Sequence, residues 1–170
     1  PFSSRRRHTR SCPKSRGLGD VYKRQNTDTV DTVLPVTAKY TDIVMYQMYA
    51  QYDIQKIGLD RWSRAVDKPF MNGDSAYALS MDGIPWPFGP IASSMEQRIV
   101  WTEEFFTKAF SRPEFVGWHY CGVIDTTTKN PKKIERQQSG LVNQYGKPYE
   151  SLQNSIKELS GNMYQIASVK

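Results

Sequence analysis

Three short runs of hydrophobic and aromatic residues stand out along the chain. The first occupies residues 41–50 (TDIVMYQMYA), the second begins residues 68–78 (KPFMNGDSAYA), and the third opens residues 115–123 (FVGWHYCGV). Apolar runs of this length are typical of strands that are buried on both faces. We therefore expect three strands, near residues 42–49, 69–73 and 115–121.

Helical spacing of apolar residues fills the intervals between these runs. Residues 54–66 show it, and residues 94–113 show it best, because Ser94 and Gln97 form a capping box at the start and Pro113 marks the end. Residues 27–40 read as the end of a helix that Pro35 disturbs, and residues 146–167 as a final helix. Residues 79–94 hold three prolines and two glycines, which predicts a loop.

The order of these elements predicts the fold class. Regular alternation of helices with buried strands indicates an α/β fold with a parallel sheet and right-handed crossovers. Three strands alone would leave unpaired edges, so we expect the C-terminal part of a larger unit, an incomplete (β/α)₈ barrel. In such barrels the reactive groups lie at the C-terminal ends of the strands. The segments YQMYAQYD, NGDSAY and GWHYCGVID place polar and aromatic residues there.

The first 25 residues differ from the rest of the chain in charge. They carry eight basic residues against Asp20, a net charge of +7, whereas the whole chain carries +6. Basic clusters of this kind are found in nucleic-acid-binding segments and in transit peptides. The segment also closely resembles translated sequencing-adapter read-through, as found at the ends of metagenomic gene fragments. We interpret residues 1–25 as a non-native or disordered tail, and residues 26–170 as the C-terminal part of the expected barrel.

Removing this tail narrows the classes of function. Residues 26–170 carry a net charge of about −1, so no nucleic-acid partner is expected. No run of 18 apolar residues occurs, so no membrane span is expected. Cys121 is the one cysteine left, which excludes a disulfide framework, and it reads as a small buried hydrophobe. His119 and Cys121 lack enough partners for a metal site, and no cofactor is expected.

The order and spacing of several sequence blocks resemble those of a known family. The blocks are KPFMNGDSAYA, a long loop, a helix containing QR, FVGWHYCGVID, RQQSGLVNQYGKPYESL and NMYQIA. Together they resemble the C-terminal portion of retaining glycoside hydrolases with a (β/α)₈ barrel, above all the agarase-like members that act on marine algal galactans. The resemblance covers roughly residues 28–167. It implies a carbohydrate substrate and a secreted or periplasmic location, and says nothing of oligomeric state.

The resemblance also implies a catalytic residue. In that clan strand 7 ends in a KP pattern followed by a nucleophilic Glu, and the matching position here is Asp74. Asp is one methylene shorter than Glu, and the carboxyl separation distinguishes retaining from inverting enzymes, roughly 5–5.5 Å against 6.5–9.5 Å. Asp74 is therefore a nucleophile in a shifted geometry, a base in an inverting relative, or a residue that binds hydroxyls. The general acid of the clan belongs to strand 4, upstream, so this chain alone should be inactive.

Other residues are candidates for binding the sugar, whose C–H faces suit aromatic platforms and whose hydroxyls suit polar groups. The resemblance implies that the Trp118 ring forms the floor of the sugar site. The alternative is that Trp118 is a core residue packed between the barrel and its helices. His119 either bonds the ring edge or supports another residue, and Asp125 either holds hydroxyls or anchors the following loop. Gln47 and Tyr49 alternate on one strand and are weaker candidates, which either face the barrel mouth together or fill the barrel interior. Trp86 in a loop is a further candidate, and Arg136 in a later loop either binds substrate or is solvated.

Competing functions remain open at this stage. A non-catalytic carbohydrate-binding relative of the same barrel family is favoured if Asp74 marks a lost nucleophile. A barrel enzyme with phosphate-binding loops after strands 7 and 8 would need Gly-rich loops, whereas these loops are rich in aromatic residues and proline. The leading hypothesis is a glycoside hydrolase that cleaves galactan-type bonds.

Overall fold

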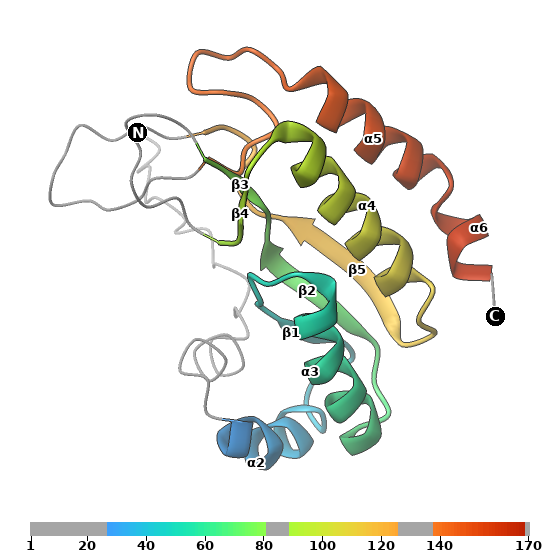
Figure 1. Cartoon of the computed structure of the whole chain (residues 1–170). Coiled ribbons are helices and arrows are strands. Elements are labelled where there is room, and N and C mark those ends of the chain that lie inside the picture. Colours follow the sequence, from blue (N-terminus) through green and yellow to red (C-terminus); the bar gives the residue numbers. More distant parts are fainter. Residues whose placement is uncertain (1–26, 81–88, 126–137, 169–170) are drawn as a thin grey trace, which may run out of the picture.

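The computed structural model describes residues 27–80, 89–125 and 138–168. Figure 1 shows the elements in chain order. The helices are α2 (Thr27–Thr37), α3 (Tyr52–Ala65), α4 (Met95–Phe110), α5 (Glu150–Gly161) and α6 (Met163–Ser168). The strands are β1 (Val44–Tyr46), β2 (Phe70–Ser75), β3 (Ala78–Leu79), β4 (Ile91–Ala92) and β5 (Phe115–Tyr120).

The main sheet contains three parallel strands in the order β1-β2-β5. Val44 pairs with Phe70, and Phe70 pairs with Phe115, so the strands begin at the same edge of the sheet. The α/β class and the three parallel strands expected from the sequence are confirmed. Strands alternating with helices are possible here because each connecting helix returns the chain to the edge at which strands start.

Helices cover one face of this sheet (Figure 1). The Trp62 ring on α3 lies 5.2 Å from the Tyr46 ring on β1 and 6.4 Å from the Phe70 ring on β2, measured between centroids. On α4, the Phe105 ring lies 5.9 Å from that of Phe115 on β5. These buried rings form the core between sheet and helices, where aromatic burial is the main source of stability.

The opposite face of the sheet is apolar and left open by the described residues. Met45 on β1 is 39% exposed and Val116 on β5 is 49% exposed. Met45 lies across Gly73 on β2, where an added Cβ would fall 2.3 Å from the Met45 Cγ and Sδ atoms. A glycine at position 73 thus lets the side chain of one strand lie flat over its neighbour.

Two expectations about the loops and the last helix were wrong in part. The ends of the expected loop at 79–94 pair as β3 and β4, since Ala78 N donates to Pro90 O at 2.9 Å and Ser80 N to Ala92 O at 3.2 Å. Backbone hydrogen bonds between residues this far apart in the chain leave no local sequence pattern, so the sequence did not predict these two strands. The expected helix at 146–167 is two helices, because α5 ends at Gly161 and a new turn begins after Asn162.

The start of α4 follows the capping box expected from the sequence. The Ser94 side chain accepts a hydrogen bond from Gln97 N at 3.2 Å, which satisfies one of the free N–H groups of the first turn. The return bond differs from the usual pattern, because Gln97 Oε1 accepts from Ser93 N at 2.8 Å instead of from the cap residue.

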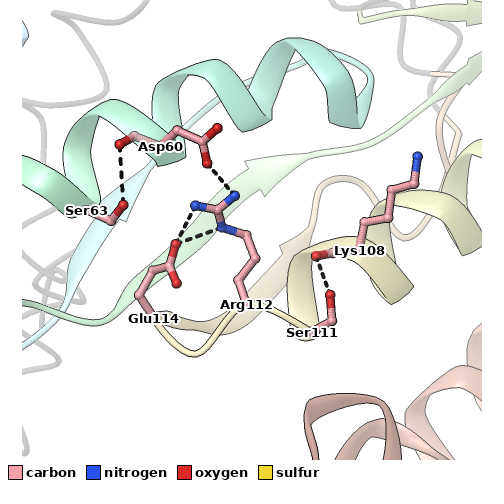
Figure 2. Close-up of polar contacts among 6 residues, drawn as sticks. All are labelled: Asp60, Ser63, Lys108, Ser111, Arg112 and Glu114. Atoms are coloured by element: carbon pink, nitrogen blue, oxygen red, sulfur yellow. Dashed lines mark hydrogen bonds and ion pairs between the residues drawn. The ribbon is translucent and has the colours of Figure 1, made fainter. Parts of the chain in front are cut away.

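An ion-pair cluster ties α3 to the start of β5 (Figure 2). Arg112 Nη1 lies 2.7 Å from Asp60 Oδ1 on α3, and Arg112 Nη2 lies 2.5 Å from Glu114 Oε1. Arg112 Nε also donates to the same Glu114 oxygen at 2.7 Å. A guanidinium that engages two carboxylates fixes a helix to a strand with defined geometry.

The tail predicted at residues 1–25 lies outside the described residues, so the division of the chain stays a prediction. Within the described ranges, no helix is both long and apolar enough to cross a lipid bilayer.

Candidate functional site

The structure brings three of the predicted residues together at one edge of the sheet. Asp74 lies near the end of β2, and Gln47 and Tyr49 follow the end of β1. Tyr49 Oη donates to Asp74 Oδ1 at 2.6 Å, and Gln47 Nε2 donates to Asp74 Oδ2. Each oxygen of the carboxylate thus accepts a hydrogen bond from a neutral side chain.

This convergence follows from the local backbone. Gln47 and Tyr49 are two residues apart, so an extended backbone points them to the same side. The pairing of β2 with β5 shifts register between Asn72 and Ser75, and Asp74 lies within this irregular stretch. Such irregularities re-aim side chains at strand ends.

A buried polar network behind Asp74 holds both strand ends and was missed in the sequence analysis. Asn72 Nδ2 donates to Gln55 Oε1 at 2.8 Å and to Met48 O at 3.3 Å, and Gln55 Nε2 donates to Ala50 O at 2.7 Å. Asn72 Oδ1 accepts from Asp74 N at 3.2 Å. The available signal was an Asn at an inward position of a buried strand, since a buried amide needs partners.

The Tyr49 hydroxyl is held in its protonated form. Burial raises the pKa of Tyr49 above its ordinary value of 10.0, and the hydrogen bonds to Asp74 and to Cys121 raise it further. Gly89, with φ at 98°, lies against the ring, and an added Cβ would fall 3.1 Å from Tyr49 Cδ1. Tyr49 is therefore a firm hydrogen-bond donor toward the carboxylate.

Trp118 lies on the helix side of the sheet. Its ring centroid is 4.5 Å from that of Phe105 on α4 and 6.5 Å from that of Tyr77. Its Nε1 donates to Ser75 Oγ at 2.9 Å. This surrounding of rings favours the alternative of a core residue over that of a sugar platform.

His119 has the opposite placement. Its side chain is exposed, and successive residues of a strand point to opposite faces, so it lies on the face away from Trp118. The register pairs Asn72 with Trp118 and Ser75 with Tyr120, which puts His119 across from the stretch that holds Asp74. Its position suits contact with a ligand at the edge of the sheet.

Asp125 anchors the loop that returns to α5. Its side chain is 2% exposed, Oδ1 accepts from Gly140 N at 2.7 Å, and Oδ2 accepts from Tyr149 Oη at 2.8 Å. Burial, followed by this bond to Asp125, raises the pKa of Tyr149 to about 12. Of the two roles expected for Asp125, the contacts match that of a loop anchor.

Two predicted residues, Trp86 and Arg136, lie outside the described residues. In the part of the chain that the structure describes, no three His, Cys, Asp or Glu side chains gather as they would around a metal ion. The chemistry available at this edge is that of one oriented carboxylate with two neutral donors. Such a group can stabilise a developing positive charge or bind hydroxyls.

Comparison with solved structures defines the class of fold. An exo-β-agarase structure matches with a TM-score of 0.71 and 24% identity, over 79% of this chain and 18% of that chain. A second agarase matches with the same score and identity, over 79% of this chain and 21% of that chain. A β-glucuronidase of Bifidobacterium dentium matches with a TM-score of 0.53 and 20% identity, over 71% of this chain and 21% of that chain. The described residues thus have a glycoside-hydrolase-like α/β fold.

The chain spans about a fifth of the length of these agarases. No protein-family model matches the sequence, and no curated protein matches it. At identities below 25%, the similarity establishes the fold only. Any reaction must be argued from the residues of this chain.

Proposed function

We propose that the chain is the C-terminal part of a (β/α)₈ glycoside hydrolase that cleaves galactan-type polysaccharides or oligosaccharides. Asp74 is its catalytic carboxylate, and Tyr49 orients it. The observation that carries the proposal is the carboxylate at the end of β2, held by Tyr49 and Gln47 in a fold shared with agarases.

The open face of the sheet supports the barrel. Met45 and Val116 are exposed apolar side chains on the face without helices, and the edges of β1 and β5 pair with no further strand among the described residues. In a (β/α)₈ barrel, this face is the filled interior and both edges are paired. The remaining strands of the same polypeptide would cover the face and close the edges.

The position of Asp74 supports the chemistry. Glycosidic cleavage passes through an oxocarbenium-like transition state, and a carboxylate beneath the anomeric carbon stabilises its positive charge. Tyr49 and Gln47 are neutral donors, so their hydrogen bonds leave the negative charge of the carboxylate in place. The proton needed by the leaving group must come from another carboxyl group, which this proposal assigns to the upstream part of the barrel.

A non-catalytic carbohydrate-binding protein is the second candidate, and one observation favours it. The catalytic position is an Asp where the family resemblance implies a Glu, and both of its oxygens already accept hydrogen bonds. In this alternative the edge binds sugar hydroxyls through Asp74 and His119, and no bond is broken.

The test uses the complete gene product that carries this sequence. Asp74→Asn keeps the shape and removes the charge, so we expect kcat on agar-type oligosaccharides to fall at least about 10³-fold with little change in KM. Added azide should restore turnover of Asp74→Asn and yield a glycosyl azide. The configuration of the wild-type product then identifies Asp74 as nucleophile or base. The matched control is Asp42→Asn, an exposed residue before β1, with unchanged kinetics.

Either of two results would overturn the proposal. One is near-normal turnover by Asp74→Asn on agar-type, porphyran-type and carrageenan-type oligosaccharides. The other is a wild-type protein that binds such oligosaccharides by calorimetry and releases no reducing ends, which would establish the binding alternative.

A further inference from the structure

Gln47 was expected to bind substrate, but its amide is turned toward Asp74 instead. We infer that Gln47 is a positioning residue which, together with Tyr49, sets the plane and reach of the Asp74 carboxylate. The inference rests on the proposed function of Asp74. It assigns Gln47 no contact with the sugar.

The two donors act on different oxygens. Gln47 Nε2 donates to Oδ2, and Tyr49 Oη donates to Oδ1 at 2.6 Å. A carboxylate bonded through one oxygen still rotates about its Cβ–Cγ bond, whereas bonds to both oxygens fix its plane. Bonds to an ionised acceptor are also stronger than bonds between neutral groups.

The backbone that carries Gln47 cannot follow a displaced carboxylate. Asn72 Nδ2 donates to Met48 O at 3.3 Å, and Gln55 Nε2 donates to Ala50 O at 2.7 Å. Both amides are fully buried, so the segment between Gln47 and the start of α3 is tied to the core. The reach of the Gln47 side chain is therefore matched to one position of the carboxylate.

Side-chain length makes this match testable. Gln47 contributes two methylenes and Asp74 contributes one, so the contact spans three in total. Exchanging the lengths, by Gln47→Asn together with Asp74→Glu, keeps the total and should rebuild the contact.

Kinetics of the complete gene product give the first measurement. We expect Gln47→Asn to lower kcat by roughly 10- to 100-fold with KM nearly unchanged, because a misplaced catalytic group loses rate without losing binding. Asp74→Glu should also lower kcat, and the double variant should exceed both single variants by about tenfold or more. The matched control is Gln51→Asn, a half-buried residue in the same segment whose side chain makes no capping bond on α3.

A second measurement does not depend on turnover. In the complete gene product labelled with ¹⁵N-glutamine, the side-chain amide signals of Gln47 in a ¹H–¹⁵N spectrum should shift when Asp74 is replaced by Asn, and those of Gln51 should not. If the shift appears while Asp74→Asn leaves turnover intact, the contact is real and the proposed catalytic role of Asp74 is what fails.

Three outcomes would overturn the inference. The first is a raised KM with unchanged kcat for Gln47→Asn, which would return Gln47 to substrate binding. The second is a double variant whose kcat does not exceed that of both single variants. The third is a Gln47 amide signal that is indifferent to Asp74. Near-ultraviolet circular dichroism checks that each variant is folded.

Discussion

At Gly140, the loop after β5 passes so close to its neighbours that no side chain fits. A Cβ at this position would fall 2.6 Å from Asp125 N, 2.7 Å from Asp125 Oδ1 and 2.7 Å from Val142 O. Gly140 also donates its N–H to Asp125, and its carbonyl accepts from Arg98 Nη2 at 2.8 Å. Two of the crowding atoms belong to the backbone, so relief requires the loop itself to move.

Gly140→Ala should therefore lower the free energy of unfolding by about 1–3 kcal/mol, the usual cost of overpacking. Urea denaturation with intrinsic fluorescence measures it. Gly161→Ala is the matched control, because no atom lies within 4 Å of the added Cβ at the end of α5. There the reduced freedom of the unfolded chain should leave stability unchanged or raise it by up to about 1 kcal/mol. Equal effects of the two variants would contradict the crowding at Gly140.

The sequence predicts where some of the candidate residues lie and leaves the placement of others open, for physical reasons. Gln47 and Tyr49 alternate on one strand and Asp74 ends the next strand, so a parallel sheet brings them together. Trp118 could not be oriented, because the register shift in β2–β5 pairing disturbs simple alternation. The partners of Asp125, at Gly140 and Tyr149, come from far along the chain, where sequence carries no local signal.

At the scale of elements, α4 was the most accurately predicted, and its N-terminus can be tested. Ser94→Ala removes the acceptor for Gln97 N and should lower the free energy of unfolding by about 1 kcal/mol. For a chain of this size, that corresponds to a fall in Tm of about 2–4 °C. Ser151→Ala, an exposed position in the first turn of α5, is the control and should change Tm little. A Ser94→Ala protein as stable as the wild type would show that water replaces the cap.

The strands were predicted less closely than α4. Their existence and parallel order follow from apolar runs between helices, but β1 has three residues where eight were expected. After Tyr46 the backbone leaves the ladder, and side-chain amides from Asn72 and Gln55 take over its hydrogen bonding. Capping signals are local and therefore visible in the sequence. The end of a strand depends instead on where its hydrogen bonds to the neighbouring strand stop, which the local sequence does not show.

For the whole molecule, the core makes stability depend on pH at the alkaline end. Burial is the main cause that raises the pKa of Tyr46 and of Tyr77 above the ordinary 10.0. Below about pH 10 both residues are protonated in the folded and unfolded states, so they give no pH dependence. Above it they ionise only in the unfolded chain, so the stability they contribute is lost as pH rises.

We expect the free energy of unfolding to fall above about pH 10 by up to about 1.4 kcal/mol per pH unit for each of these tyrosines. Urea denaturation at several alkaline pH values measures the slope. Tyr46→Phe should remove its share of the slope, at the cost of the 3.1 Å bond to Gln55 Oε1. A wild-type stability that is flat to about pH 11 would contradict the buried phenols.

The Arg112 cluster has a consequence for how this fold can be altered. Arg112 and Glu114 (Figure 2) precede β5. Asp74 lies near the other end of β2, so the ion pairs and the carboxylate lie at opposite ends of parallel strands. Replacing loops at the Asp74 end should therefore leave the Arg112 ion pairs between α3 and the start of β5 in place. Variants of the loops at the Asp74 end and variants around the Arg112 cluster can therefore be selected from separate libraries. Their effects should add when they are combined, because distant sites act independently.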